Sequence, residues 1–369
     1  MLSMRNLLVA AILAATQVSA SAVEVTTSFT LTGVTSPGTY TFSSLNALPQ
    51  QTQTVSYLSG STPVTATYSG PSLYSVIESA GWPSVPGANN STLRDVVVAT
   101  GSDGYRVVYS NGELNPNFGN KPAIIAINET VGGTSAPLGA DGFARTTAPG
   151  DVRGGRYVSN LASLNVVQAP SNPSQGGGKS TSFTVCQVAQ NAIFNASSLA
   201  ALPQNTLTVG SDVYTGVYLW DLINSLGIIT DPSVKNDILS LYVLATGSDG
   251  YEVAFSMGEL NPLFGNMSDL VALTLNGQPI DQNGFARIIA PNDVKARTLG
   301  QQSRQPGGSG CRLSRRGRSG ALHLGNDDPW LCRRWLHDVS PAKDSRARGL
   351  IDPEREYGDR PRAVFLLAA

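Results

Sequence analysis

Histidine and cysteine are almost absent from the first 297 residues of the chain. Both histidines and two of the three cysteines lie after residue 297, so the earlier part contains Cys186 and no histidine. Ser-His-Asp triads, Cys-His pairs and ordinary zinc sites are therefore excluded from this part. A disulfide within it is excluded as well, because a disulfide needs two cysteines.

Charge is scarce too, since only 14% of the residues are charged, whereas the chain has 38 glycines and 22 prolines. This composition favours a turn-rich, β-leaning secreted protein, and 369 residues are enough for two ordinary domains. Up to residue 297 there are 12 Lys and Arg against 18 Asp and Glu, and after it 13 against 8. A mildly acidic main part argues against nucleic acid as a partner.

Long apolar runs are also missing, and the longest one lies at the N-terminus. Residues 1–22 have one charge at Arg5, an apolar core over 7–15 and small residues up to Ala20 and Ala22. This pattern predicts a secretory signal peptide that is cut after Ala20 or Ala22. A membrane anchor is the less favoured alternative, because the run is shorter than the roughly 20 residues that span a bilayer. We therefore expect an exported protein.

A stretch of the sequence occurs twice. Residues 99–120, ATGSDGYRVVYSNGELNPNFGN, recur as ATGSDGYEVAFSMGELNPLFGN at 245–266, a constant shift of 146 positions. Self-similarity of this length indicates a duplicated domain. We expect repeat one at 23–169, a Pro/Gly/Ser-rich linker at 170–182 and repeat two at 183–297.

Each repeat shows the same predicted elements. The apolar residues of Ser69–Gly81 and Thr215–Gly227 recur at helical spacing, and both segments stop at glycine. The Asp-Gly pairs at 103–104 and 249–250 lie between alternating runs, which predicts a β-hairpin in each repeat. The whole pattern indicates a β-rich α+β fold.

Repeat two does not end as repeat one does. Repeat one closes with GGRYVSNLASLNVV, a predicted strand, whereas the sequence after Ala296 reads RTLGQQSRQPGGSG. A one-base change of reading frame converts residues 297–307 into GRWVSNLVSL, which restores that strand. We interpret 298–369 as frameshifted, expect it to be disordered, and expect repeat two to lack its last strand.

The same change of frame converts residues 318–348 into a Pro-Glu-Pro motif, an apolar span and an Arg cluster. This string resembles a PEP-CTERM sorting tail, which implies exosortase processing in a Gram-negative bacterium that makes extracellular polysaccharide. The resemblance implies a periplasmic or extracellular location. An apolar span followed by basic residues stops translocation, so a membrane anchor is expected only if the tail is restored to frame.

The order of elements, the apolar helix that follows a glycine, and the DGY strand resemble the oxidoreductase molybdopterin-binding domain of the sulfite oxidase superfamily. The resemblance covers about residues 29–167 and 183–296 and implies two tandem copies of that fold. In the family, a cysteine before the helix binds molybdenum, and Arg and His hold the pterin phosphate. Here the corresponding segments, 54–68 and 206–214, contain no Cys, His or Arg.

The departure from the family pattern bears on activity. Cys186 falls on the first strand of repeat two, where we expect a buried apolar thiol rather than a metal ligand. The fold is therefore expected without the catalysis, with no catalytic residue, metal or cofactor. Molybdopterin is implied by the family resemblance alone.

Polar residues that recur in both copies are the candidate ligand-binding residues. They are Asp103, Tyr105, Glu113, Asn115 and Arg145 in repeat one, with Asp249, Tyr251, Glu259, Asn261 and Arg287 in repeat two. Grouped around one cleft, they would suit a small polar ligand, a sugar or an oxyanion. Alternatively, the Asp residues form turns, the Glu and Asn residues satisfy backbone groups near the prolines, and each Arg pairs with an acid. For any single residue the second interpretation is favoured.

Three functions remain open from the sequence. The first is an exported, non-catalytic tandem module that binds a small polar ligand or an extracellular polysaccharide. The second is a molybdopterin-dependent oxidoreductase. The third is a structural surface protein of an extracellular polysaccharide matrix.

Overall fold

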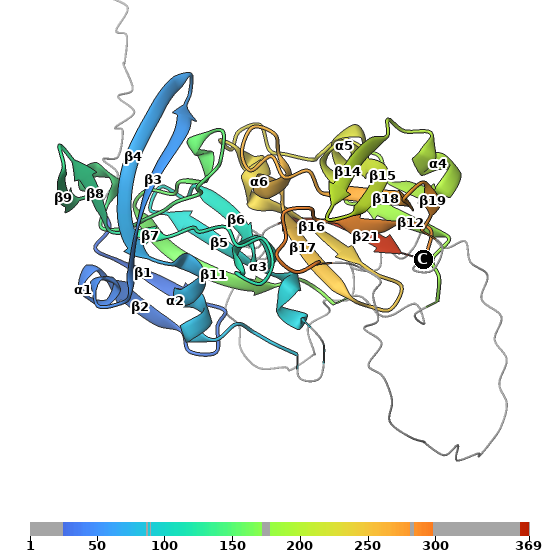
Figure 1. Cartoon of the computed structure of the whole chain (residues 1–369). Helices are drawn as coiled ribbons and strands as arrows, with labels where there is room; N and C mark the ends of the chain where they lie inside the picture. Colours follow the sequence, from blue (N-terminus) through green and yellow to red (C-terminus); the bar gives the residue numbers. More distant parts are fainter. Residues whose placement is uncertain are drawn as a thin grey trace, which may run out of the picture.

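Two β-rich units lie side by side in the computed structural model, which describes residues 25–85, 88, 90–171, 178–280, 284–297 and 362–368 (Figure 1). The predicted β-rich α+β class is confirmed. The signal peptide, residues 172–177 of the linker and residues 298–361 of the tail lie outside the described residues. Within the described ranges, no helix is long and apolar enough to cross a membrane.

The central sheet of repeat one has five strands in the order β2-β1-β11-β5-β6. Their bounds are β1 Ser28–Thr32, β2 Gly38–Thr41, β5 Asp95–Gly101, β6 Arg106–Ser110 and β11 Leu161–Gln168. Strand β11 runs parallel to β1 and antiparallel to β5. It therefore links the first hairpin of the repeat to the hairpin that the Asp-Gly pair forms.

A second layer of repeat one carries a long hairpin. It contains β3 Gln50–Ser59, β4 Thr62–Pro71, β8 Asn128–Val131 and β9 Thr134–Pro137, beside the pair β7 Ile125–Ala126 and β10 Arg145–Thr146. The helical segments are α1 Phe42–Asn46, α2 Leu73–Ala80, α3 Asn111–Leu114, η1 Ser91–Arg94, η2 Gly139–Asp141 and η3 Gly154–Arg156.

Helix α2 begins later than the sequence predicts, because residues 69–71 belong to β4. A Cβ atom on Gly70 would lie 2.0 Å from the carbonyl oxygen of Ile125, and one on Gly216 would lie 2.1 Å from that of Val271. The glycine before each predicted helix therefore serves a close approach between strands.

Repeat two repeats this arrangement with a sheet of order β13-β12-β21-β16-β17. Its strands are β12 Ser182–Cys186, β13 Ala192–Asn195, β16 Leu241–Thr246, β17 Glu252–Ser256 and β21 Arg362–Ala368. The second layer has β14 Asn205–Val209, β15 Asp212–Tyr218, β18 Leu270–Leu275, β19 Gln278–Pro279 and β20 Arg287–Ile289. The helices are α4 Ala196–Ala200, α5 Leu219–Ser225, α6 Met257–Leu260 and η4 Asp237–Ser240.

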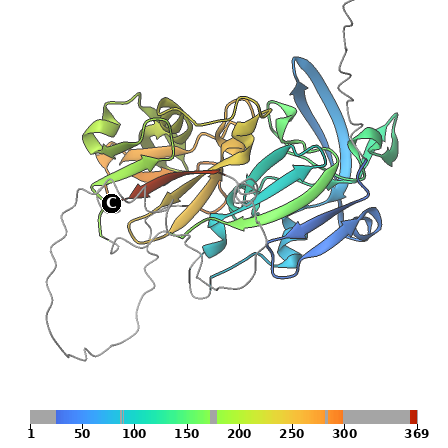
Figure 2. The ribbon, with the colours of Figure 1, turned by 180° about the vertical axis from the view of Figure 1, so that it is seen from behind.

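Strand β21 corrects one expectation from the sequence. Residues 362–368, expected to be disordered, lie between β12 and β16, where β11 lies in repeat one. The view from behind shows this red strand inside the second sheet (Figure 2). Its direction is reversed, because β21 is antiparallel to β12 and parallel to β16. Unpaired strand edges bind an extended segment readily, and β12 and β16 would both have such an edge without β21. Repeat two therefore does have a strand at this position.

The two repeats pack through their central sheets. Val98 of β5 and Val108 of β6 lie in one buried cluster with Leu244 of β16 and Ala254 of β17. The other face of β5 lies in the core of its own repeat, so this strand is buried on both sides. This part of the boundary between the repeats is therefore as apolar as a domain core.

Backbone contacts across the boundary are reciprocal. The Val152 N–H donates to the Phe264 carbonyl at 2.9 Å, and the Val294 N–H donates to the Phe118 carbonyl at 2.8 Å. Val294 is the counterpart of Val152, and Phe118 is the counterpart of Phe264, so the same contact occurs twice with the repeats exchanged. Such reciprocal contacts are typical of two-fold symmetry. The repeats are therefore related by a local pseudo-two-fold axis.

We predict that the repeats unfold together. Leu244→Ala leaves a cavity at the boundary and should lower the free energy of unfolding by about 2–5 kcal/mol in a single transition, measured by chemical denaturation. Ile193→Ala, at a side chain 69% exposed, is the control and should change it by less than about 0.5 kcal/mol. Two separate transitions, of which only one shifts, would contradict this.

Candidate functional site

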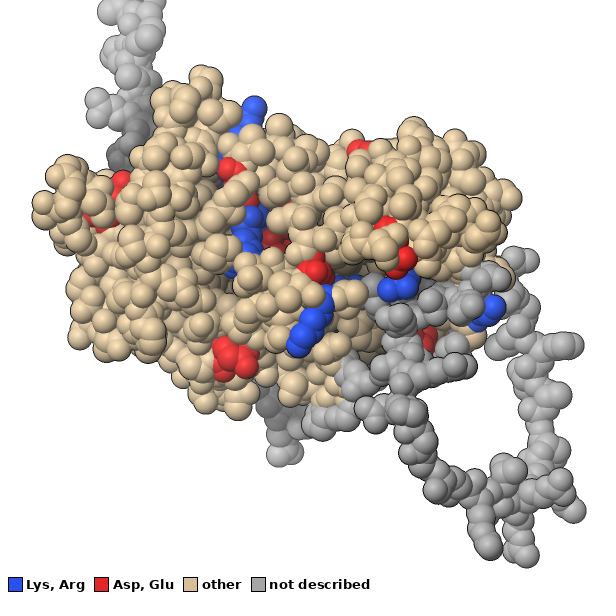
Figure 3. Space-filling model, in the orientation of Figure 1, with Lys and Arg blue, Asp and Glu red and all other residues tan. Residues whose placement is uncertain are grey.

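A cleft of about 1110 Å³ opens between the two repeats. Repeat one contributes the end of β3 and the segment around η3, and repeat two contributes residues 230–238 and 261–264. In the space-filling view, Lys, Arg, Asp and Glu side chains gather around the hollow between the two halves of an otherwise largely uncharged face (Figure 3).

One wall of the cleft is an ordered stack of rings and one guanidinium. The rings of Tyr57 and Tyr157 stack with centroids 4.3 Å apart, and the Arg145 guanidinium lies 5.6 Å from the Tyr157 ring. Arg145 Nη1 also donates to the Tyr68 hydroxyl at 3.0 Å and pairs with Asp141. The charge of Arg145 is thus already paired, so this side chain orders the wall.

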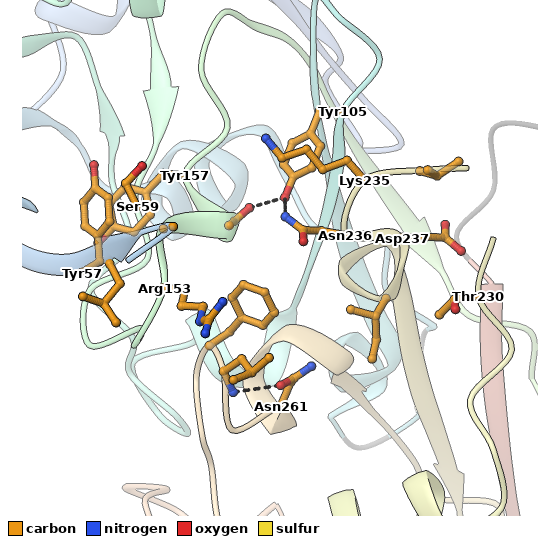
Figure 4. A pocket seen from close by; sticks show the side chains of 18 of the residues that line it. Tyr57, Ser59, Tyr105, Arg153, Tyr157, Thr230, Lys235, Asn236, Asp237 and Asn261 are labelled. Atoms are coloured by element: carbon orange, nitrogen blue, oxygen red, sulfur yellow. Dashed lines mark hydrogen bonds between the residues drawn. The ribbon is translucent and has the colours of Figure 1, made fainter. Parts of the chain in front are cut away.

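The facing wall is held by a contact between the repeats. The Tyr105 hydroxyl donates to the Gly155 carbonyl at 2.6 Å and accepts from Asn236 Nδ2 at 3.0 Å (Figure 4). The Asp103 carboxylate accepts from the Tyr105 N–H at 3.0 Å, and Lys235 Nζ lies 6.0 Å from the Tyr105 ring. Burial raises the pKa of Tyr105, so the phenol stays neutral.

The acidic side chains of the cleft are engaged in hydrogen bonds within the protein. Asp231 Oδ1 accepts from the Ser233 N–H at 2.9 Å and from its hydroxyl at 2.7 Å, and these bonds lower the pKa of Asp231. Asp237 accepts from the Asp231 N–H at 2.6 Å and pairs with Arg362. Part of the acceptor capacity of these carboxylates is therefore used within the protein.

Two basic side chains of the cleft remain available. Arg153 and Lys235 are exposed on its lining, and neither forms an ion pair with any residue in the described part of the chain. Figure 4 shows Arg153 between the tyrosine wall and Asn261. Arg153 and Lys235 are thus the lining cations that are free to contact an anionic or strongly polar group, beside the carboxylates of Asp103, Asp231 and Asp237.

The duplicated glutamates lie outside the cleft, buried at the boundary between the repeats. Glu113 accepts two hydrogen bonds from Arg156 Nη1, at 3.0 and 2.9 Å, and one from the Ser256 hydroxyl at 3.4 Å. Glu259 accepts from the Ser110 hydroxyl at 2.8 Å. Each glutamate therefore bonds to a serine of the other repeat.

Two buried arginines complete this cluster. Arg156 donates to Asp151 through Nε and Nη2 at 2.6 and 2.7 Å, and Arg297 donates to Asp293 through the same atoms at 2.5 and 2.8 Å. Arg297 Nη1 lies 3.6 Å from Glu259.

Two glycines of the duplicated motif make room for these arginines. A Cβ on Gly258 would lie 2.5 Å from Cδ of Arg156, and one on Gly112 would lie 2.3 Å from Nη1 of Arg297. Each arginine therefore packs against the Gly-Glu turn of the opposite repeat, which gives these glycines of the repeated motif a steric role.

The two halves of the cluster differ in charge. In repeat one, Lys121 donates to Asp151 at 2.7 Å, but the position 146 residues later is Met267. Repeat two instead has the buried Asp269. Burial and the neighbouring Glu113 raise the pKa of Glu259 well above its ordinary value, and burial raises that of Asp269 to about 7. The second half therefore has one basic side chain fewer than the first, and its carboxyls hold protons to higher pH than ordinary carboxyls do.

The remaining predicted site residues mostly order backbone. Asn115 Oδ1 accepts from the Asn117 N–H, and Asn261 Oδ1 accepts from the Leu263 N–H, both at 2.9 Å, around the two prolines. Of the ten candidates, only four line the cleft: Asp103, Tyr105, Arg145 and Asn261.

Three candidates of repeat two lie elsewhere. Asp249 accepts from the Tyr251 N–H at 3.0 Å, and the Tyr251 hydroxyl accepts from Asn90 Nδ2 at 3.3 Å. Arg287 is half-buried on β20, and burial lowers its pKa. The structure does not bring these residues to the cleft.

Sequence reasoning missed several cleft residues, among them Arg153, Tyr157, Lys235 and Asn236. For Asn236 the sequence held one signal, because this residue lies 146 positions after Asn90, another asparagine. In the structure both residues adopt a left-handed backbone with φ 52°. For Lys235 no comparable signal exists in the sequence.

The sequence matches no family model and no curated protein. Among solved structures, the sulfane dehydrogenase SoxCD from Paracoccus pantotrophus is a distant neighbour, with 14% identity and a TM-score of 0.32. The match covers 53% of this chain and 54% of that chain, so this chain spans about half the length of its neighbour. A likeness at this level assigns no activity.

No group of three or more His, Cys, Asp or Glu side chains in the described ranges could hold a metal ion. Cys186 is buried on β12, 2% exposed, and does not line the cleft.

We predict that substitution by glutamine affects the stability of the protein unequally at the two glutamates. Glu113→Gln weakens the buried contact with Arg156 and should lower the free energy of unfolding by about 3–5 kcal/mol at pH 7. Burial raises the pKa of Glu259, and Arg297 Nη1 lies 3.6 Å away, so Glu259→Gln should change this free energy by about 1 kcal/mol or less. Denaturant titration of both variants measures this, and equal losses would refute the assigned asymmetry.

We also predict a pH dependence from Asp269. Its raised pKa gives a stabilising contribution that is present below the ordinary pKa near 3.8 and is lost as the pH rises through about 7. The stability of Asp269→Asn relative to wild type should therefore increase between about pH 4 and 7, by up to about 1.4 kcal/mol per pH unit, and then level off. A difference between the two proteins that stays constant over this range in thermal denaturation would argue against it.

Proposed function

We propose that the protein is an exported, non-catalytic binding module, and that the cleft between its repeats binds a small anionic ligand such as an acidic sugar unit. The observation that carries this proposal is the charge arrangement of the cleft. Arg153 and Lys235 have no ion-pair partner in the described part of the chain, whereas Asp103, Asp231 and Asp237 are held by hydrogen bonds.

The shape and chemistry of the lining support a polar organic ligand. Tyr57, Trp220 and Phe264 offer apolar surface, and Asn224 and Thr230 add neutral hydrogen-bonding groups. Ligand sites combine such walls with a few polar groups and usually enclose roughly 300–1,000 Å³. The cleft volume is close to the upper end of this range, which suits a ligand of a few sugar rings better than a simple inorganic anion.

The absence of a catalytic set on the cleft lining supports a binding role. The lining contains no histidine or cysteine among its described residues, and the buried pair Glu113 and Glu259 does not reach it. General acid and base catalysis requires groups within hydrogen-bond reach of the substrate. The lining acids Asp103 and Asp231 instead accept hydrogen bonds from their own turns.

The molybdopterin that the family resemblance implies does not fit the residues present. The hairpin β3–β4, which precedes helix α2, presents Tyr57 and Ser59 to the cleft and has no thiol. Cys186 is buried on another strand. Stoichiometric molybdenum in protein purified from its native compartment would overturn the non-catalytic assignment.

We predict that acidic sugars bind through Arg153 and Lys235. Calorimetry with glucuronic acid oligomers should show binding that weakens with salt, and Arg153→Ala combined with Lys235→Ala should weaken it at least about tenfold. Lys295→Ala is the matched control, because Lys295 corresponds to Arg153 in repeat two and bonds to Asn117 instead.

Neutral glucose oligomers provide the second control. Equal binding of neutral and acidic oligomers, or unchanged affinity in the double variant, would rule out the proposed anionic site.

A further inference from the structure

The central sheet of repeat two is completed by a segment from a distant part of the chain. Strand β12 pairs with β21 over four residues, from Phe183 with Ala368 to Cys186 with Phe365. Strand β16 pairs with the same segment over six residues, beginning with Leu241 opposite Arg362. Without β21, the facing edges of β12 and β16 would both present unpaired N–H and C=O groups.

Repeat one provides an internal comparison for this position. Strand β11 is parallel to β1 and antiparallel to β5, whereas β21 is antiparallel to β12 and parallel to β16. Val364 and Leu366 of β21 are buried, as are Leu164 and Val166 of β11. Alternate side chains lie on one face of a strand whichever way it runs, so a reversed strand can still fill the core.

The equivalent positions of the two sheets thus hold strands of opposite direction and different sequence that share alternating buried apolar residues. Main-chain hydrogen bonds to both neighbours give such a site its affinity, and pockets for alternate side chains give it specificity. This mode of binding is called strand addition, and here the added strand β21 lies in the interior of a sheet.

We propose that the gap between β12 and β16 is a strand-acceptor site that binds an extended segment with the pattern of β11, and that residues 362–368 are its exchangeable intramolecular occupant. The partner it fits is a donated strand from another chain with apolar residues at alternate positions, running in the direction that β11 takes in repeat one.

The connection to β21 explains why the occupant exchanges. Residues 290–361 separate β20 from β21, whereas residues 147–160 separate β10 from β11. The entropy cost of closing a loop grows with its length, so β21 is held in place less firmly than β11. The ion pair of Arg362 with Asp237 is the only salt bridge of β21 among the described residues, and the Arg362 side chain is 48% exposed. We expect β21 to open while the rest of the sheet stays folded.

A labelled peptide with the sequence of residues 161–168, LASLNVVQ, tests the site in the full-length protein. The double variant Val364→Lys with Leu366→Lys places charges at two buried positions and should release β21. Fluorescence anisotropy should then show peptide binding at least tenfold tighter than to wild type. Arg362→Lys is the matched control on the exposed position and should behave as wild type.

A second peptide with Asn165→Pro controls for non-specific adhesion. Proline lacks the N–H that an interior strand needs, so this peptide should bind at least tenfold more weakly to the double variant. Equal binding of both peptides would overturn the proposal, and so would the absence of peptide binding to a double variant that retains its thermal transition.

Hydrogen exchange of the wild-type protein tests exchangeability without any substitution. The amides of β21 should exchange at least tenfold faster than those of β11 and of the β16–β17 hairpin under conditions in which the protein stays folded. If β21 exchanges only as slowly as β11, through global unfolding, the strand is a permanent part of the sheet and the proposal is wrong. This measurement decides the matter even if the double variant does not fold.

Discussion

The pairing of buried charged groups at the repeat boundary is the constraint on which the rest of the structure depends. A buried carboxylate or guanidinium is tolerated only when its hydrogen-bonding capacity is satisfied. Here Ser110 donates to Glu259 and Ser256 donates to Glu113, so each buried glutamate accepts a hydrogen bond from the other repeat. Each repeat thus contributes one hydrogen bond to the buried glutamate of the other.

This mutual dependence also fixes the cleft. The walls belong to different repeats, and their separation follows from the packing of β5 and β6 against β16 and β17. The bond from Asn236 to Tyr105 then closes the contact at the cleft itself. A ligand site built in this way is formed when the repeats associate, because no single repeat contains both walls.

The two halves are related by symmetry but are not equivalent. Lys121 is replaced by Met267, and the ion pair between Arg94 and Glu252 has no counterpart, because the equivalent positions are Ser240 and Arg106. Divergence of this kind lets one side of a pseudo-two-fold boundary specialise. The raised pKa values of Glu259 and Asp269 in repeat two are one product of it.

The sequence predicted the local features well. The class of fold, the apolar helices and the burial of Cys186 follow from periodicity and residue chemistry, which act over short distances. Helix α2 begins after Gly70 rather than before it, because the close approach to Ile125 is a contact between distant segments.

The site was harder to predict, because repetition in a sequence shows that two positions are equivalent and not that they are near each other. The identity of Glu113 and Glu259 gave no sign that they meet at one boundary, nor that Arg156 binds Glu113 and packs against Gly258. The turn roles of Asp103 and Asn261 were within reach, since each bonds to the backbone two residues away.

The reversed strand of repeat two has a consequence for how this fold tolerates change in its gene. A position that accepts either chain direction requires of its occupant little more than alternating apolar residues. Short segments with that pattern arise often, even in sequence that was never selected to be a strand. A duplicated domain with such a position can lose the coding information for its last strand and still close its sheet, so the architecture is more robust than the sequence that encodes it.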